Sequence, residues 1–268
     1  MPKIMLDAGH YGKYNQGAVP EYWESEMSWQ LHLLLKAELE KYGFIVGTTR
    51  TNQVADMEVY TRGTKAKGYD MFLSLHSNAT GTGVNESVDH PIVIRQNADV
   101  ASEAFCQKLS NKIAELMKTK QAGRTGTRVQ TNGAEYYGVL RGAKALGCNK
   151  AYIIEHSFHS ASAPCRWLMN IDNLKRLAEE ESKIIAEYYG LKKEVEDMTR
   201  EETIALIKEM TKEKVYHYGT ELPEWAKDDV KFLMDKGIFK GVAPNDLNLS
   251  ESLLRTLCWI ARAIRQFK

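Results

Sequence analysis

The sequence has little of several features that would indicate particular classes of protein. Cysteines number only four in 268 residues, and their spacing fits neither a disulfide framework nor a cysteine zinc site. We therefore expect reduced thiols in a cytosolic protein. The sequence has no excess of charge of one sign: 36 Lys and Arg residues are balanced by 35 Asp and Glu residues, and the formal net charge is +1. This balance gives no electrostatic reason to expect a nucleic acid or an anionic membrane as partner.

Long hydrophobic runs are also missing. No stretch approaches the ~20 apolar residues that a membrane-spanning helix needs. The chain passes from Met1-Pro2-Lys3 directly into a short apolar segment, without the pattern of a secretory signal peptide. A glycine-rich phosphate-binding loop is not found either. With 43% apolar residues, the chain can still form one large domain and one small domain.

Three short apolar segments each end near a residue that can bind a metal ion or transfer a proton. They are residues 3–8, followed by His10; residues 70–75, followed by His76; and residues 151–154, followed by Glu155. Each segment has the length and composition of a buried strand. Ligands of open α/β sheets bind outside the carboxyl ends of the strands. If the three strands are parallel, the three side chains converge at one edge of the sheet.

The rest of the first 190 residues alternates between strand-like and helix-like patterns. Helical spacing of apolar residues predicts helices from Glu24 to Gly43 and within 58–67, 97–118 and 164–189. Further strands are predicted at 44–49, 91–95, 126–130 and 136–140. We therefore predict an α/β domain over residues 1–190. It has three α/β/α layers and a twisted, mostly parallel sheet of about six strands.

The last part of the chain has a different pattern. Residues 191–198 are rich in charge and suit a linker. Thr199 to Glu202 fits a capping box that starts a helix, and two further helical patterns cover 223–236 and 250–266. We predict a small all-helical domain over residues 199–268.

Two histidines and one carboxylate form a ligand set of catalytic zinc, which leaves a fourth position open for water or substrate. His10 and His76 supply the imidazoles. The spacing of the sequence does not choose the carboxylate. The four candidates are Glu21, Glu24, Glu26 and Glu155.

A family resemblance adds to this reading. Residues 3 to about 189 resemble the zinc-dependent N-acetylmuramoyl-L-alanine amidases of the amidase-3 family, and the match lies in a series of short motifs in the same order. In chain order they are Asp7-Ala8-Gly9-His10, similar to D-P-G-H; Gly17-Ala18; Glu24; Thr49-Arg50; Arg62; Ser74-Leu75-His76-Ser77-Asn78, similar to S-[IL]-H-x-N; and Ile153-Ile154-Glu155, similar to L-V-E. Two segments depart from the family: Ala8 stands in place of a proline, and His156 to Ser160 stand in place of a glycine-containing run.

The resemblance implies the roles of the site residues. His10, Glu24 and His76 would hold one zinc ion per chain, and Glu155 would act as general base and acid. The substrate would be bacterial peptidoglycan, cut at the amide between N-acetylmuramic acid and L-alanine. Residues expected to contact the substrate are Asn78, His156 and His159.

Several functional alternatives stay open. Since no signal peptide is seen, we expect a phage or prophage endolysin that stays in the host cytoplasm until lysis and then reaches the cell wall, with a secreted autolysin as the alternative. Residues around Trp225 and Gly237 faintly resemble a single S-layer-homology unit, which implies binding to a cell-wall polymer; self-association into a homo-oligomer is the alternative. The opposed hypotheses are a non-enzymatic wall-binding protein on the same fold and another zinc peptidase or deacetylase.

Overall fold

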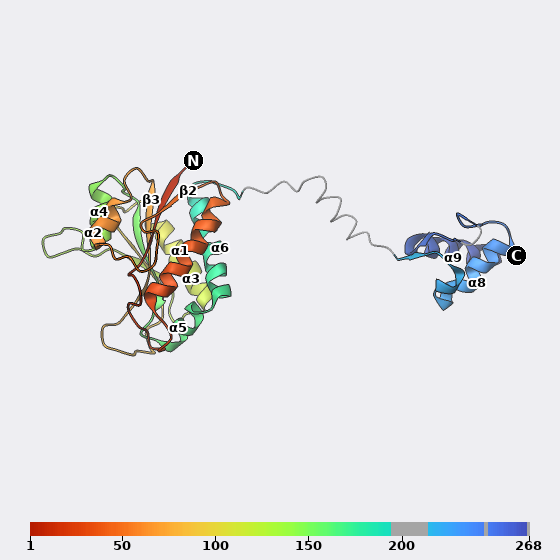
Figure 1. Cartoon of the computed structure of the whole chain (residues 1–268), viewed down its shortest axis with the longest axis horizontal. Coiled ribbons are helices and arrows are strands. Elements are labelled where there is room, and N and C mark those ends of the chain that lie inside the picture. Colours follow the sequence, from red (N-terminus) through yellow and green to blue (C-terminus); the bar gives the residue numbers. More distant parts are fainter. Residues whose placement is uncertain (194–213, 244–245, 267–268) are drawn as a thin grey trace. The chain divides into compact units, whose positions relative to one another are not determined.

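Six strands form one sheet in the N-terminal part of the chain (Figure 1). They are β1 (Lys3–Ala8), β2 (Ile45–Thr48), β3 (Met71–Asn78), β4 (Ile92–Arg95), β5 (Arg124–Gly126) and β6 (Ala151–Phe158). Their order across the sheet is β2-β1-β3-β6-β4-β5. All neighbouring pairs are parallel except β4 and β6, which are antiparallel. The predicted mostly parallel sheet of about six strands is confirmed.

Helices cover both faces of this sheet. One face packs against α1 (Glu24–Glu40), α3 (Glu103–Met117) and α6 (Ile171–Tyr188), and α5 (Ser162–Leu168) precedes α6. The other face carries α2 (Val59–Thr64) and α4 (Gly138–Ala145), which pack against each other (Figure 1). Successive strand residues point to opposite faces, so Ile4 and Leu6 join the first core and Met5 joins the second. The predicted three-layer arrangement is therefore also confirmed.

Two predicted strands are corrected by the structure. Residues 136–140 lie at the start of α4 and not in a strand, because a short apolar run does not distinguish a buried strand from a buried helix. The helical form is favoured by close packing on α2: a Cβ added at Gly63 would lie 2.0 Å from the Val139 carbonyl oxygen, and one at Gly142 would lie 2.1 Å from that of Tyr60. The strand predicted at 126–130 lies earlier, at Arg124–Gly126.

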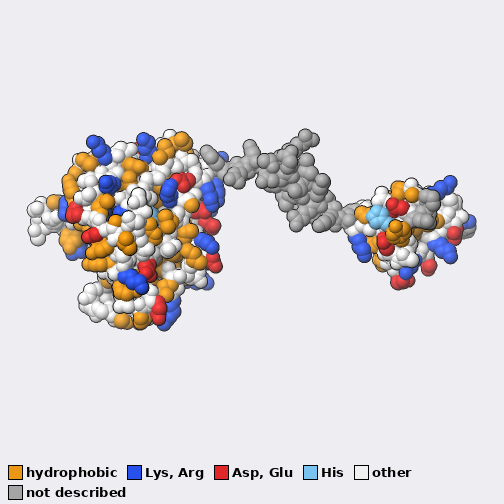
Figure 2. Space-filling view, in the orientation of Figure 1, with side chains coloured by type: hydrophobic (Ala, Val, Ile, Leu, Met, Phe, Trp, Pro, Cys, Tyr) orange, Lys and Arg blue, Asp and Glu red, His pale blue; other side chains and the backbone are white. Residues whose placement is uncertain are grey.

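The computed structural model describes residues 1–193, 214–243 and 246–266. The chain divides into two compact units, Met1–Val195 and Glu196–Lys268. Most of the predicted linker at 191–198 and the helix predicted to start at Thr199 lie outside the described residues. Within the described ranges, no helix combines the length and apolar character needed to cross a membrane. On the face shown in Figure 2, basic and acidic side chains are interspersed, as the balanced net charge implies.

The second unit is mainly helical, with one addition to the prediction. In the described part of this unit the α-helices are α8 (Glu224–Asp235) and α9 (Glu251–Gln266), which pack against each other. Two short antiparallel strands, β7 (Val215–Tyr216) and β8 (Leu249–Ser250), make a second sheet that an all-helical prediction does not include. Tyr216 and Leu249 are register partners in this sheet, and both side chains join the small core of the unit.

Candidate metal centre

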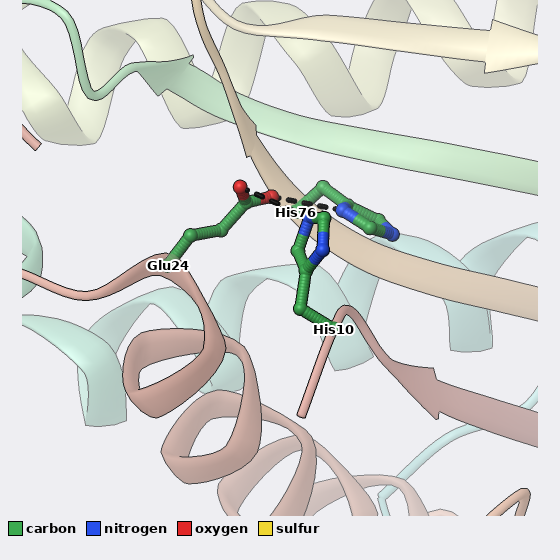
Figure 3. Close-up of side chains that lie close together, drawn as sticks. All are labelled: His10, Glu24 and His76. Atoms are coloured by element: carbon green, nitrogen blue, oxygen red, sulfur yellow. Dashed lines mark hydrogen bonds and ion pairs between the residues drawn. The ribbon is translucent and has the colours of Figure 1, made fainter. Parts of the chain in front are cut away.

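The ends of two neighbouring strands and the start of one helix bring His10, Glu24 and His76 together (Figure 3). His10 follows β1, His76 lies in β3, and Glu24 is the first residue of α1. The backbone carbonyl of Asn15 accepts the Glu24 N–H (3.0 Å), so the loop after β1 also holds the start of α1. One ligand atom from each of the three residues lies within 4.8 Å of the others.

The carboxylate of Glu24 is the centre of this cluster. Its Oε1 lies 2.8 Å from His76 Nδ1 and its Oε2 lies 3.1 Å from His10 Nε2. Asn15 donates its side-chain amide to Oε2 (2.7 Å) and Ser77 donates its backbone N–H to Oε1 (3.0 Å). Burial opposes the charged form, but the contacts with His10 and His76 outweigh it and hold the pKa of Glu24 well below its usual range. Glu24 is therefore ionised and fixed in place.

The other candidate carboxylates are placed differently. Glu21 and Glu26 line a separate cavity of about 430 Å³ beside Trp23 and Met27. Glu155 shares the cavity of the cluster but does not belong to it. Among the four acids that the sequence left open, the structure brings Glu24 to the two histidines.

The backbone of the segment from Ala8 to His10 is closely constrained. A Cβ added at Gly9 would lie 2.5 Å from His76 Cε1 and 2.7 Å from the Leu75 carbonyl oxygen, so only glycine lets the imidazole of His76 pass. His10 has φ 59°, a left-handed conformation that costs free energy for a non-glycine residue. The ring of His10 stacks on Tyr14 with the ring centroids 4.9 Å apart. These contacts hold both imidazoles toward Glu24.

Glu155 lies next to the cluster on the neighbouring strand. It is the register partner of His76 in the β3–β6 pair. Its Oε2 is buried and has no hydrogen-bond partner among the described residues. Burial, followed by the charge of Glu24, raises the pKa of Glu155 to about 8. A carboxyl group with a pKa near neutrality can both take up and release a proton in the range that suits general acid-base catalysis.

A cleft of about 460 Å³ opens onto these residues. Its lining includes the three residues of the cluster and Glu155, together with Asn78 and His159. Val59 and residues 136–139 also line the cleft. Asn78 and His159 thus lie where the sequence placed substrate contacts. His159 is mostly buried, and its Nδ1 lies 2.9 Å from both the carbonyl and the hydroxyl oxygen of Ser77.

His156 does not lie in the cleft, so its assignment as a substrate contact is corrected. Adjacent strand residues point to opposite faces of a sheet, so the neighbour of Glu155 faces α6. There His156 is fully buried, 2.8 Å from Glu181 Oε1 through Nε2, and its Nδ1 donates to the His76 carbonyl (2.8 Å). Burial lowers the pKa of His156, but the charge of Glu181 and the hydrogen bonds to Glu181 and to the His76 carbonyl together outweigh burial and raise the pKa above its usual value.

The donor set fits a zinc ion. Two imidazole nitrogens and one carboxylate oxygen are ligands that zinc prefers, and three protein ligands leave a position for water or substrate. The buried oxygen of Glu155, which has no partner among the described residues, lines the same cleft. The residues that would hold the ion are therefore His10, Glu24 and His76.

Sequence reasoning missed several residues that support the site. Asn15, in the loop after β1, and Ser77, next to His76 in β3, both donate to Glu24, and nothing in their local sequence indicates this. Glu181 of α6 is the buried partner of His156 behind the cleft. Asp7 and Ser74 could have been noticed, because they are polar residues inside apolar strands. Such positions need buried partners.

Two histidines, a glutamate and a separate carboxylate around one cleft at the edge of an α/β sheet are an arrangement compatible with a metal-dependent hydrolase. The sequence model of the Amidase_3 family, described as N-acetylmuramoyl-L-alanine amidase, matches residues 4–187. The chain belongs to this amidase family. No curated protein matches it in sequence.

Solved structures show the same fold. The catalytic domain of CwlV, an N-acetylmuramoyl-L-alanine amidase from Bacillus (Paenibacillus) polymyxa var. colistinus, has 21% identity and a TM-score of 0.59, with 72% of this chain and 100% of that chain covered. An N-acetylmuramoyl-L-alanine amidase from Clostridium difficile 630 has 20% identity and a TM-score of 0.59, covering 70% and 97%. Cwp6 from Clostridium difficile has 20% identity and a TM-score of 0.59, covering 69% of this chain and 29% of that protein.

Proposed function

We propose that this protein is a zinc-dependent amidase that hydrolyses the bond between N-acetylmuramic acid and L-alanine in peptidoglycan. The observation that carries the proposal is the convergence of His10, Glu24 and His76 beside Glu155 in one cleft. Membership of the amidase family supplies the substrate class. The zinc dependence rests on the donor set.

The chain's own residues have defined tasks in this reaction. Zinc, when bound, supplies Lewis-acid polarisation of the scissile carbonyl and activates the attacking water. Glu155 takes a proton from that water at its carboxylate and returns it to the alanine nitrogen, which is a poor leaving group until it is protonated. Asn78 and His159 line the cleft and contact the substrate beside the cut bond.

Product analysis of digested peptidoglycan tests the activity. An amidase releases intact stem peptides with a new alanine N-terminus, whereas a peptidase or deacetylase gives different masses and a binding protein gives none. Metal analysis should find one zinc per chain, and chelation should abolish turnover. Retention of full zinc occupancy in a His76→Ala, Glu24→Ala double variant would refute the ligand assignment.

Replacement of Glu155 tests its role separately. Glu155→Gln should keep the fold and the zinc but lose about a hundred- to ten-thousand-fold in turnover, because an amide cannot accept the proton. Glu21→Gln, at an exposed acid of another cavity, is the matched control and should leave turnover unchanged. Near-normal turnover of Glu155→Gln at unchanged zinc content would assign the proton transfer elsewhere.

We also propose that the C-terminal unit attaches the enzyme to a cell-wall polymer, as expected of an endolysin that meets the wall at lysis. All hydrophobic residues of the two N-terminal cores lie between Ile4 and Leu191. A chain that ends after Lys193 should therefore stay folded and cleave soluble muropeptides, while sedimentation with whole cell walls falls. If the shortened chain sediments with cell walls as well as the full chain does, the C-terminal unit does not attach the protein to the wall.

A further inference from the structure

Asp7 and Ser74 are polar residues inside two otherwise apolar strands, and neither lines the cleft. Both side chains are completely buried. They are register partners in the β1–β3 pair, and Ser74 lies two residues before His76, on the same face of the sheet. A buried polar pair behind a proposed metal ligand has to be explained by its hydrogen bonds.

The hydrogen bonds form a chain that ends at the imidazole of His76. The Ser74 hydroxyl lies 2.7 Å from Asp7 Oδ2 on one side and 3.1 Å from His76 Nε2 on the other. Thr49 donates its hydroxyl to Asp7 Oδ1 (2.6 Å), and Arg62 Nη1 lies 3.7 Å from the same oxygen. The second oxygen of Asp7 is thus left to Ser74.

The direction of each hydrogen bond follows from the number of protons available. Thr49 and Arg62 face Oδ1 of Asp7 as donors, and Ser74 directs its hydroxyl at Oδ2, so both carboxylate oxygens act as acceptors. The single hydroxyl proton of Ser74 is therefore donated to Asp7. Toward His76 the Ser74 oxygen can only accept, so the proton at that contact belongs to Nε2 of the imidazole.

A proton on Nε2 of His76 determines whether Nδ1, the other ring nitrogen, can bind a metal ion. Nδ1 is the nitrogen that lies beside Glu24, where the three candidate ligand atoms converge. A nitrogen binds a metal ion only through a free lone pair. Without an ion, the carboxylate of Glu24 accepts a hydrogen bond from Nδ1 at 2.8 Å. When a metal ion takes that position, Nδ1 gives up its proton and binds through the lone pair, and the ring keeps its single proton on Nε2 because Ser74 can only accept there.

We propose that Asp7 and Ser74 are positioning residues that keep His76 protonated at Nε2 and so present Nδ1 to the metal ion. The consequence for metal binding rests on the zinc centre proposed above. The hydrogen-bond chain itself does not depend on an ion.

Nitrogen NMR of the full-length protein with ¹⁵N-labelled histidine tests the proton directly. Long-range ¹H–¹⁵N spectra should show a proton on His76 Nε2 both without zinc and with one equivalent of Zn²⁺, and an unprotonated Nδ1 when zinc is present. An unprotonated Nε2 in either spectrum overturns the proposal. If the wild type binds no zinc, the proposed metal centre fails, but the zinc-free spectrum still decides the position of the proton.

Zinc affinity, measured by competition with a chromophoric chelator, tests the consequence. Ser74→Ala should raise the Kd for Zn²⁺ about ten- to a hundredfold, the usual effect of removing a hydrogen-bond partner of a metal-binding histidine. Ser110→Ala is the matched control, because Ser110 is equally buried but donates to the Gln107 carbonyl within α3. Equal affinities of the two variants overturn the proposal. Should Ser74→Ala fail to fold, the wild-type spectra alone decide.

Discussion

The guanidinium of Arg62 donates to the carbonyl oxygen of His10 at 3.1 Å, across 52 positions of sequence. The same side chain donates to the carbonyl oxygens of Ala8 (3.1 Å) and Met57 (2.7 Å). Arg62 is almost fully buried, so these contacts are not screened by solvent. The arginine on α2 therefore holds the left-handed backbone of His10.

Replacement of Arg62 by lysine should weaken zinc binding. A lysine ammonium cannot reproduce a planar fork that reaches three carbonyl groups. We expect Arg62→Lys to raise the zinc Kd about ten- to a hundredfold, in the range found for residues that orient metal ligands. Chelator competition measures the effect. Arg166→Lys, at an exposed position of α5, is the control, and equal Kd values for the two variants would contradict this role.

A methyl group at Gly9 should displace the imidazole of His76. The added Cβ would lie 2.6 Å from His76 Nδ1, so the ring has to move away from Glu24. We expect Gly9→Ala to lose at least about tenfold in zinc affinity, as for other changes in the support of a metal ligand. Gly126→Ala is the control because its Cβ meets nothing within 4 Å. Titration of both variants with zinc should separate them, and wild-type affinity of Gly9→Ala would show that the ring has room.

The stability of the zinc-free protein should depend on Glu155 between about pH 5 and 8. The folded state raises the pKa of Glu155 from 4.5 to about 8, so in this range the folded protein keeps a proton that the unfolded chain has lost. The free energy of unfolding therefore falls as pH rises, by about 1.4 kcal/mol for each pH unit over which the two states differ by a whole proton.

Urea denaturation at several pH values measures this dependence. Glu155→Gln carries no titrating group and should remove the decline. It should be more stable than the wild type at pH 8 and approach it near pH 5. Parallel stability curves for the two proteins would show that Glu155 titrates normally.

Replacement of the buried Glu181 should lower the free energy of unfolding much more than replacement of an exposed glutamate on the same helix. Glu181 and His156 are both completely buried and lie 2.8 Å apart. Glu181→Leu leaves a buried imidazole without its partner, which typically costs about 3–5 kcal/mol. Glu179→Leu, on an exposed position of α6, should change the free energy of unfolding by about 0.5 kcal/mol or less. A urea-denaturation loss below 1 kcal/mol for Glu181→Leu would mean that the pair is not a buried ion pair.

The local pattern of the sequence was sufficient for much of the fold. Apolar runs of strand length ending near His10, His76 and Glu155 predicted three strands that, if parallel, bring these side chains to one edge of a sheet. The structure pairs β1 with β3 and β3 with β6, both in parallel, so the condition is met. This succeeds because strand and helix periodicities are properties of a few consecutive residues. The same alternation places His156 on the face opposite Glu155, a consequence that the sequence analysis did not draw.

Tertiary structure alone decided the remaining features. Whether residues 136–140 form a strand or the start of α4 depended on the close approach of Gly63 and Gly142 between two helices. Spacing in the sequence left four acids open and only the family resemblance pointed to Glu24; the physical reason for that position lies in the loop that carries Asn15, which binds the start of α1. The partner of His156 came from α6. Such contacts join residues far apart in the chain. The periodicity of a few consecutive residues does not predict which side chains will meet when a sheet and its helices pack together.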